Sequence, residues 1–306
     1  MYIVQWLRES KVRIRQDGMT GAKRSLQPVK NKLISLGDVL TDSGRPIYEF
    51  DWDLLVILDA CRLDLMREVA DEYEWIEDLG SIRSVNSATA AWMRDTFVQS
   101  YREEMAETSY VCGNPFSESQ LRAGDFAELA EIWQSAWVEP GTVPPEAITD
   151  ETIRRMRDSD TERVIAHYMQ PHCPFLDADD LSKGKELDNF GDQEWRDVWE
   201  KLSDGSLEKQ EVWEGYRHNL RAGLDEVETL LNNVDADRVI VTSDHGNALG
   251  EWTVYGHPGD MPFDCLRTVP WIETDATDSK TRDPEDWTAN EADAGRTEQL
   301  HALGYR

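Results

Sequence analysis

The sequence predicts an α/β fold with a doubly wound, mainly parallel sheet flanked by helices. Three apolar runs, partly β-branched, predict strands buried on both faces, and segments with helical spacing separate them along the chain. This alternation is typical of an open parallel sheet. Reactive groups in such sheets gather at the carboxyl ends of the strands, so the residues after each run are the first candidates for chemistry.

Each predicted core strand ends in polar residues. DWDLLVILDA (51–60) ends near Asp59, RVIAHYMQPHCPF (163–175) runs into a loop with His172, and DRVIVTSDHG (237–246) ends at Asp244 and His245. A further strand is expected in TSYVCGNPF (108–116), which leaves the core through a turn that contains Asn114. These polar ends would meet at one edge of the sheet.

Helical spacing of apolar residues predicts the helices. They are expected at 62–79, in WMRDTFVQSY (92–101), at 125–137, at 146–158 and, as a long amphipathic helix, at 212–234. Residues 80–91 are small and polar and are expected to be irregular, and 177–206 to be an exposed acidic insertion. The predicted organisation is a helical leader at 1–45, one large domain at 46–272 and an acidic, partly disordered tail at 273–306.

The charge balance is strongly acidic. Lys and Arg number 32 and Asp and Glu 61, which gives a net charge of −29. Such a surface repels nucleic acid and anionic lipid, so no nucleic-acid partner is expected. The acids occur in every segment, which favours adaptation to a high-salt cytoplasm over a specialised acidic binding face.

The cysteines and the N-terminus bear on location. The four cysteines form no C-x-x-C pair, so a structural zinc site is not expected. Such a low cysteine content in a chain of this size favours reduced thiols in a cytosol. We find neither a secretory signal nor a run of about 18 apolar residues, so no transmembrane segment is expected. The first 35 residues are basic, and they suggest either peripheral membrane contact or a leader helix packed on the domain. The expected location is cytoplasmic, with membrane association as an alternative.

Three ordered motifs resemble those of the alkaline phosphatase/sulfatase superfamily. VTSDHGNALGEWTVYGHP (241–258) is similar to its D-H-G, G-E and G-H-P signature, LLVILDACRLD (54–64) to its first strand, and HYMQPHCPF (167–175) to its H-x-P-F element. The resemblance covers about residues 50–272 and is nearest to sulfatase-like proteins of haloarchaea. It implies an alkaline-phosphatase-like fold and a catalytic domain at 46–272.

The resemblance also implies a nucleophile at the start of a helix. The matching stretch is SVNSATAAW (84–92), where Thr89 falls at the nucleophile position and Ser87 is the alternative. A helix N-terminus helps to hold a transferred anion, although a hydroxyl there can also be a simple N-cap. The C-x-P-S-R motif of formylglycine sulfatases is absent, and Ala60 stands where many sulfatases carry a second acid.

The implied metal set is Asp59, Thr89, Asp244 and His245, around one divalent cation: Mn, Mg, Zn or Ca. Asp59 alone would suit a helix N-cap equally well. A second metal is less favoured, because its candidates are only His257 with Asp225 or His218.

The other candidate residues would act on the ester itself. His172 and His257 are expected to be catalytic, with His172 also binding substrate and His257 titrating near neutral pH. Arg62 and Asn114 are expected to bind the substrate anion, with a salt bridge to Asp64 as the alternative for Arg62. His167, His218 and His301 are expected to be structural or surface residues.

The predicted function is metal-dependent hydrolysis or transfer of phosphate esters through a threonine nucleophile. One alternative is a sulfuric ester hydrolase without formylglycine. The other is an inactive sulfatase-like binding protein in a cell-surface glycan pathway. The expected substrate is a small-molecule or a glycan- or lipid-linked ester.

Overall fold

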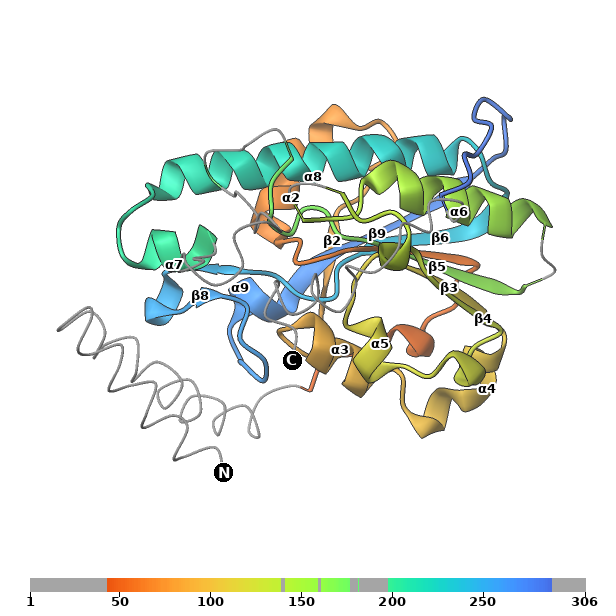
Figure 1. Ribbon diagram of the computed structural model, residues 1–306, viewed down its shortest axis with the longest axis horizontal. Helices are drawn as coiled ribbons and strands as arrows, with labels where there is room; N and C mark the ends of the chain where they lie inside the picture. Colours follow the sequence, from red (N-terminus) through yellow and green to blue (C-terminus); the bar gives the residue numbers. More distant parts are fainter. Residues whose placement is uncertain (1–42, 139–140, 159–160, 177–180, 182–197, 288–306) are drawn as a thin grey trace.

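A computed structural model describes residues 43–138, 141–158, 161–176, 181 and 198–287 (Figure 1). The predicted leader therefore lies almost wholly outside the described residues, as do most of the acidic insertion and the end of the tail. The strands are β1 (Leu54–Leu58), β2 (Gly80–Arg83), β3 (Thr108–Cys112), β4 (Glu128–Glu131), β5 (Arg163–Tyr168), β6 (Ala236–Thr242), β7 (Ala248–Leu249), β8 (Tyr255–Gly256) and β9 (Thr268–Ala276).

The α-helices vary from one turn to 23 residues in length. They are α2 (Leu63–Val69), α3 (Thr89–Thr96), α4 (Arg102–Ala106), α5 (Ser117–Gln120), α6 (Pro145–Asp158), α7 (Val198–Ser203), α8 (Lys209–Leu231) and α9 (Asp264–Arg267). The 3-10 turns are η2 (Ile47–Glu49), η3 (Ala70–Glu72), η4 (Gln99–Tyr101), η5 (Ala123–Asp125), η6 (Ile132–Gln134) and η8 (Glu251–Thr253).

The central sheet has seven strands in the order β2-β9-β6-β1-β5-β3-β4. The five strands from β6 to β4 pair in parallel, whereas β9 is antiparallel to both β6 and β2. Strands β2 and β6 therefore run in the same direction, and their carboxyl ends lie at the same edge as those of β1, β5 and β3. The predicted doubly wound, mainly parallel sheet is confirmed.

Helices cover both faces of this sheet (Figure 1). In β1, Leu54, Val56 and Leu58 face the core under α2, α6 and α8, whereas Leu55 and Ile57 pack with residues of η2, α3 and α4. All five residues of β1 are fully buried, because alternate side chains enter different cores. This two-sided burial explains the continuous apolar run in the sequence.

Most of the predicted helices are confirmed, but the one at 125–137 is wrong. That segment forms η5, the edge strand β4 paired with β3, and the short turn η6. Its apolar residues fit a strand as well as a helix, and the pairing with β3 decided between them. The predicted helix at 62–79 is also shorter, since α2 ends at Val69 and only η3 follows.

Besides β4, two strands of the central sheet lie where the sequence suggested none. Residues 80–83, within a segment expected to be irregular, form β2 and pair with β9. Strand β9 continues to Ala276, so the sheet extends beyond residue 272, where the acidic tail was expected to begin. Beyond it, Arg157 and Arg282 hold the following residues to the domain through Asp278 and Asp150.

Candidate metal-dependent active site

The polar ends of neighbouring strands meet at one edge of the sheet. Asp244 follows β6, Asp59 follows β1, His172 follows β5 and Asn114 follows β3, and these four strands are adjacent. Strand β2 ends at the same edge, and the loop after it leads into α3, which begins at Thr89. Sheet order thus gathers side chains that are up to 185 positions apart in the sequence.

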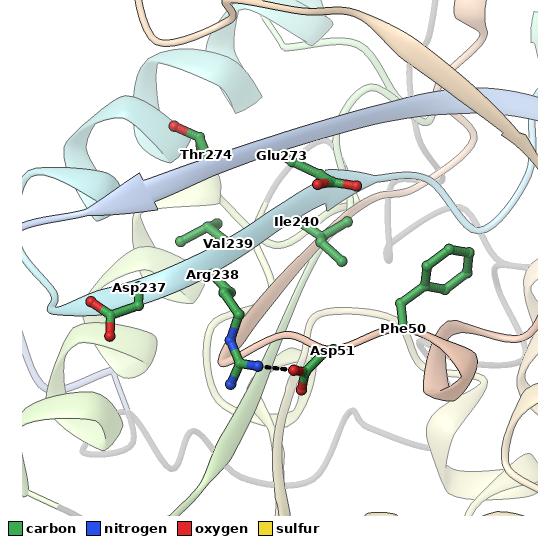
Figure 2. Close-up of a pocket in the computed structure, with 8 residues that line it drawn as sticks. All are labelled: Phe50, Asp51, Asp237, Arg238, Val239, Ile240, Glu273 and Thr274. Atoms are coloured by element: carbon green, nitrogen blue, oxygen red, sulfur yellow. Dashed lines mark hydrogen bonds and ion pairs between the residues drawn. The ribbon is translucent and has the colours of Figure 1, made fainter.

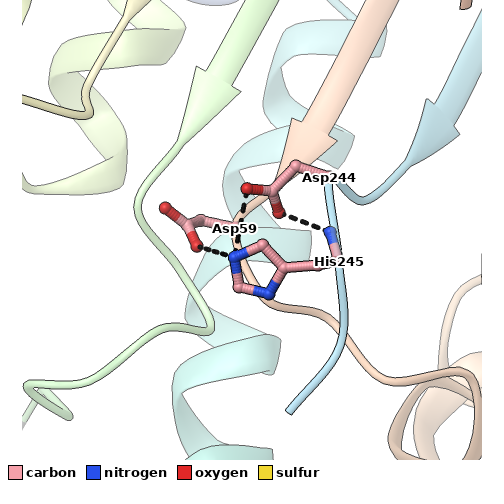
Figure 3. A group of neighbouring side chains, drawn as sticks. All are labelled: Asp59, Asp244 and His245. Atoms are coloured by element: carbon pink, nitrogen blue, oxygen red, sulfur yellow. Dashed lines mark hydrogen bonds and ion pairs between the residues drawn. The ribbon is translucent and has the colours of Figure 1, made fainter. Parts of the chain in front are cut away.

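Asp59, Asp244 and His245 form a compact buried group (Figure 3). One ligand atom from each lies within 4.8 Å of the others, and all three residues are fully buried. His245 Nε2 is 3.4 Å from Asp244 Oδ2 and 3.8 Å from Asp59 Oδ1. Arg62 is the N-cap residue of α2, so Asp59 is not a helix cap.

The Thr89 hydroxyl points at this group. Its Oγ1 is 3.0 Å from His245 Nε2 and 3.4 Å from Asp59 Oδ1. Ala88 is the N-cap of α3, so Thr89 is the first helical residue and does not have a capping role. The alternative, Ser87, is committed elsewhere, because its Oγ donates to Pro258 O at 2.7 Å and accepts from Met261 N at 2.9 Å.

The electrostatics of the two carboxylates fit a divalent cation. Burial and repulsion from Asp244 raise the pKa of Asp59 well above its usual value. Burial opposes ionisation of Asp244 too, but electrostatic interaction with the neighbouring imidazoles of His245 and His167, and the hydrogen bond from Ala60 N, hold its pKa below the usual value. Asp244 Oδ2 is buried without a hydrogen-bond partner, a state that is costly unless another ligand occupies it. Asp59, Thr89, Asp244 and His245 together offer the oxygen and nitrogen donors that such a cation needs.

His172 and His257 lie against this group and face each other. Their Nε2 atoms are 2.9 Å apart, and the His257 ring stacks on His245 with 4.5 Å between centroids. Burial lowers the pKa of His172 to about 4, and burial together with the neighbouring imidazoles of His245 and His172 lowers the pKa of His257 well below its usual value. Both rings are neutral at pH 7, so the expectation that His257 titrates near neutral pH is wrong for this arrangement.

Arg62 and Asn114 have other partners than the expected anion. The guanidinium of Arg62 donates to both oxygens of Asp64, at 2.8 and 2.6 Å, and to Glu251 Oε1 at 2.8 Å. This is the salt bridge that the sequence left as the alternative, and it occupies the side chain. Asn114 Nδ2 donates to Asp59 Oδ2 at 2.6 Å, so Asn114 orients a carboxylate of the site.

Of the other histidines, His167 lies next to the candidate site. His167 is fully buried beside Asp59, a position that its place inside a strand run did not reveal. His301 lies outside the described residues. Among the described residues, Asp225 does not lie in a group of three metal-binding side chains, and its carboxylate accepts a hydrogen bond from the Tyr73 hydroxyl at 2.7 Å.

A separate cavity of about 350 Å³ lies along β6 and β9 (Figure 2). Arg238, near the amino end of β6, forms ion pairs there with Asp51 and Asp53. The cavity is therefore away from the strand ends that carry the candidate site, and we assign it no chemistry. Its lining residues are Phe50, Asp51, Asp237, Arg238, Val239, Ile240, Glu273 and Thr274.

Comparison with known proteins identifies the fold. No protein-family model and no curated protein matches the sequence. Among solved structures, the soluble domain of lipooligosaccharide phosphoethanolamine transferase A from Neisseria meningitidis matches with a TM-score of 0.50 and 14% identity, over 77% of this chain and 79% of that one. The intact integral membrane form matches with a TM-score of 0.51 and 14% identity, over 94% of this chain but 61% of its own length.

A third solved structure has a slightly lower TM-score than these two. It is the C-terminal periplasmic domain of phosphoethanolamine transferase EptC from Campylobacter jejuni, with a TM-score of 0.49 and 15% identity, over 72% of this chain and 78% of that one. Among the described helices, none is both long and apolar enough to cross a membrane. Sheet topology and the two matches with TM-scores of 0.50 and 0.51 together establish the predicted alkaline-phosphatase-like α/β fold.

Proposed function

We propose that this chain is a metal-dependent enzyme that transfers or hydrolyses phosphate esters through Thr89. One observation carries the proposal: the Thr89 hydroxyl at a helix N-terminus lies within 3.4 Å of both His245 and Asp59, beside the unpaired Oδ2 of Asp244. A nucleophilic hydroxyl next to buried metal-ligand side chains is the arrangement that activates an otherwise weak nucleophile. The phosphoethanolamine transferases of similar fold agree with this class of reaction.

Asp59, Asp244, His245 and Thr89 would hold the cation, and the histidine donor favours Zn or Mn over Ca. The bound cation would lower the pKa of the Thr89 hydroxyl and offset negative charge on the phosphoryl group. Thr89 Oγ1 loses its proton to solvent and forms a bond to phosphorus, while the bond between phosphorus and the ester oxygen breaks. The ester oxygen leaves with that electron pair and takes up a proton from solvent. Water or an acceptor alcohol then attacks the phosphorus of phospho-Thr89 and releases the threonine.

His257 and His172 would act together on a phosphoryl oxygen in this scheme. His172 Nδ1 donates to the backbone oxygen of Cys173, so a neutral His172 accepts at Nε2 and His257 Nε2 is the donor between the two rings. With substrate bound, His257 would turn this N–H from His172 to a non-bridging oxygen as the charge of that oxygen grows in the transition state. The substrate beyond the phosphoryl group stays a prediction, as does the cytoplasmic location.

Replacement of the nucleophile tests the proposal. We expect Thr89→Ala to lower kcat/KM on the preferred ester by about 10³-fold or more, since removal of a covalent nucleophile has effects of this size. Thr89→Ser should retain part of the activity and accumulate a phosphoryl adduct on the peptide that contains Ser at position 89. Rates are compared on 4-nitrophenyl phosphate, its bis(4-nitrophenyl) diester and 4-nitrophenyl sulfate, after chelation and after addition of Mn, Mg, Zn or Ca.

The controls separate the competing functions. Ser87→Ala removes the hydroxyl of the alternative nucleophile, and we expect it to lower the melting temperature without abolishing the phosphoryl adduct. Faster turnover of the sulfate than of either phosphate would favour the sulfuric ester hydrolase instead. Full activity of Thr89→Ala on its best substrate would disprove the nucleophile, and no turnover with any ester and metal would leave the binding-protein alternative.

A further inference from the structure

The side chain of His167 lies behind the Asp59 carboxylate, on the side away from Thr89. It is carried by the central strand β5, beside Ile57 of β1 and Cys112 of β3, and is fully buried. Its Nδ1 is 2.7 Å from the Tyr110 hydroxyl, and its Nε2 is 3.9 Å from Asp59 Oδ2 without a hydrogen-bond partner. The rings of Trp92 and His167 pack nearly perpendicular to each other, with 5.9 Å between their centroids. This packing also restricts the orientation of the imidazole.

The Tyr110 contact determines which ring nitrogen carries the proton. The Tyr110 hydroxyl is 2.7 Å from Nδ1 inside the core, and the other ring nitrogen, Nε2, faces an oxygen of the Asp59 carboxylate. A phenol that donates to Nδ1 leaves the imidazole proton on Nε2, and this tautomer avoids placing a nitrogen lone pair against the carboxylate. The unpaired atom is then an N–H donor directed at a carboxylate oxygen.

The two oxygens of Asp59 consequently have different surroundings. Oδ2 accepts from Asn114 Nδ2 at 2.6 Å and faces His167, whereas Oδ1 faces Thr89 Oγ1 at 3.4 Å and His245 at 3.8 Å. We propose that His167, oriented by Tyr110, is a positioning residue that holds Asp59 with Oδ1 toward Thr89 and the cation. This inference rests on the proposed function, because it concerns the orientation of a metal ligand.

A histidine that only fills the core would behave differently on substitution. His167→Met fills a similar volume with an apolar side chain that has no donor, whereas His167→Gln can place an amide N–H near the former Nε2. Tyr110→Phe keeps the ring and removes only the hydroxyl that orients the imidazole. A packing role predicts that stability alone changes, and a positioning role predicts that metal affinity depends on the donor.

The full chain is first freed of metal with a chelator, which is then removed. Calorimetric titration of this metal-free protein with MnCl₂ or ZnCl₂ tests the inference without any substrate. We expect His167→Met to weaken metal binding about 10- to 100-fold, the usual effect of losing a contact behind a metal ligand. His167→Gln should recover most of that loss, and Tyr110→Phe should weaken binding several-fold. Melting temperatures of the metal-free variants report on packing separately.

The outcomes distinguish this inference from the proposed function. Metal affinity of His167→Met equal to that of the unmodified chain, or equal losses in the Met and Gln variants, would overturn the positioning role alone. If His167→Met does not fold, unchanged affinity in Tyr110→Phe would overturn it as well. Failure of the unmodified chain to bind Mn, Mg, Zn or Ca would overturn both, and loss of binding in Asp59→Asn is the positive control.

Discussion

Arg62 is buried with its charge fully paired. It is 7% exposed, and its guanidinium donates to Asp64, to Glu251 and, at 2.6 Å, to the backbone oxygen of Asn247. Burying an arginine is tolerable only when several acceptors surround it. The side chain therefore joins the segment after β1 to the turn η8, and it stabilises the frame of the candidate site.

Glu251→Gln should lower the free energy of unfolding by about 1–2 kcal/mol at pH 7, because a charged acceptor of Arg62 is lost. Burial disfavours the Glu251 carboxylate, yet Arg62 holds its pKa below the usual value. The stabilisation is thus fully present above the unfolded-state pKa of about 4.3 and is lost as the pH falls through the lower folded-state value. Urea unfolding of both proteins between pH 7 and about 3.5 measures this difference.

A matched control is Asp264→Asn, which removes the partner of Arg83. The Asp264 side chain is 87% exposed, so solvent screens this pair and its loss should change stability by less than about 0.5 kcal/mol. The difference in free energy of unfolding between Glu251→Gln and the unmodified protein should shrink as the pH falls. A difference as large at pH about 3.5 as at pH 7 would contradict the charge-pair explanation.

At the scale of elements, the connection from β6 to β7 packs tightly against α9. Gly246 N donates to Leu266 O at 2.8 Å, and a Cβ on Gly246 would lie 2.2 Å from the backbone oxygen of Cys265. Neither backbone segment can yield without moving the strand end. Glycine at this position therefore lets the loop that carries His245 approach α9 closely.

Gly246→Ala should destabilise the protein by at least about 2 kcal/mol and weaken metal binding, because the loop must shift to relieve the clash. The comparison is Gly124→Ala, where an added Cβ meets nothing within 4 Å and stability should change by less than about 1 kcal/mol. Thermal melts of the chelated and metal-loaded forms check both effects. Equal stability of the two variants would show that the loop is not constrained as described.

The strands that the sequence missed share a physical cause. Strand β2 is largely exposed or half-buried, and β9 contains Pro270 and alternates with acids, so neither shows an apolar run. Both are positioned by antiparallel pairing to a neighbour that is remote in sequence. The core strands β1, β5 and β6 were predictable, because burial on both faces demands apolar residues at successive positions.

At the scale of the whole molecule, the net charge of −29 should make stability depend on salt. Carboxylates distributed over one small surface repel each other, and salt at molar concentration reduces that repulsion. We expect the melting temperature to rise by about 5 °C or more between roughly 0.1 and 2 M KCl. A flat or falling melting temperature over this range would contradict the predicted adaptation to high salt.

The sequence by itself determined the order of the core strands along the chain and the polar residues at their ends. It could do so because a strand buried on both faces requires a continuous apolar run. The first polar residue after such a run shows where the chain leaves the buried sheet. These local patterns pointed to Asp59, Asp244 and His245 at the strand ends. The choice of Thr89, and the grouping of all four residues around one cation, came from the resemblance of the motifs to those of the alkaline phosphatase/sulfatase superfamily.

Only the tertiary structure decided which partner each candidate side chain has. Ser87 donates a hydrogen bond to Pro258, Arg62 to Glu251 and Asn114 to Asp59. Each of these bonds depends on strands and loops that meet only after folding. The placement of His167 behind Asp59 depends on β5 pairing next to β1. Such contacts join residues far apart in the chain, and hydrogen-bond geometry over those separations leaves no periodic pattern in the sequence.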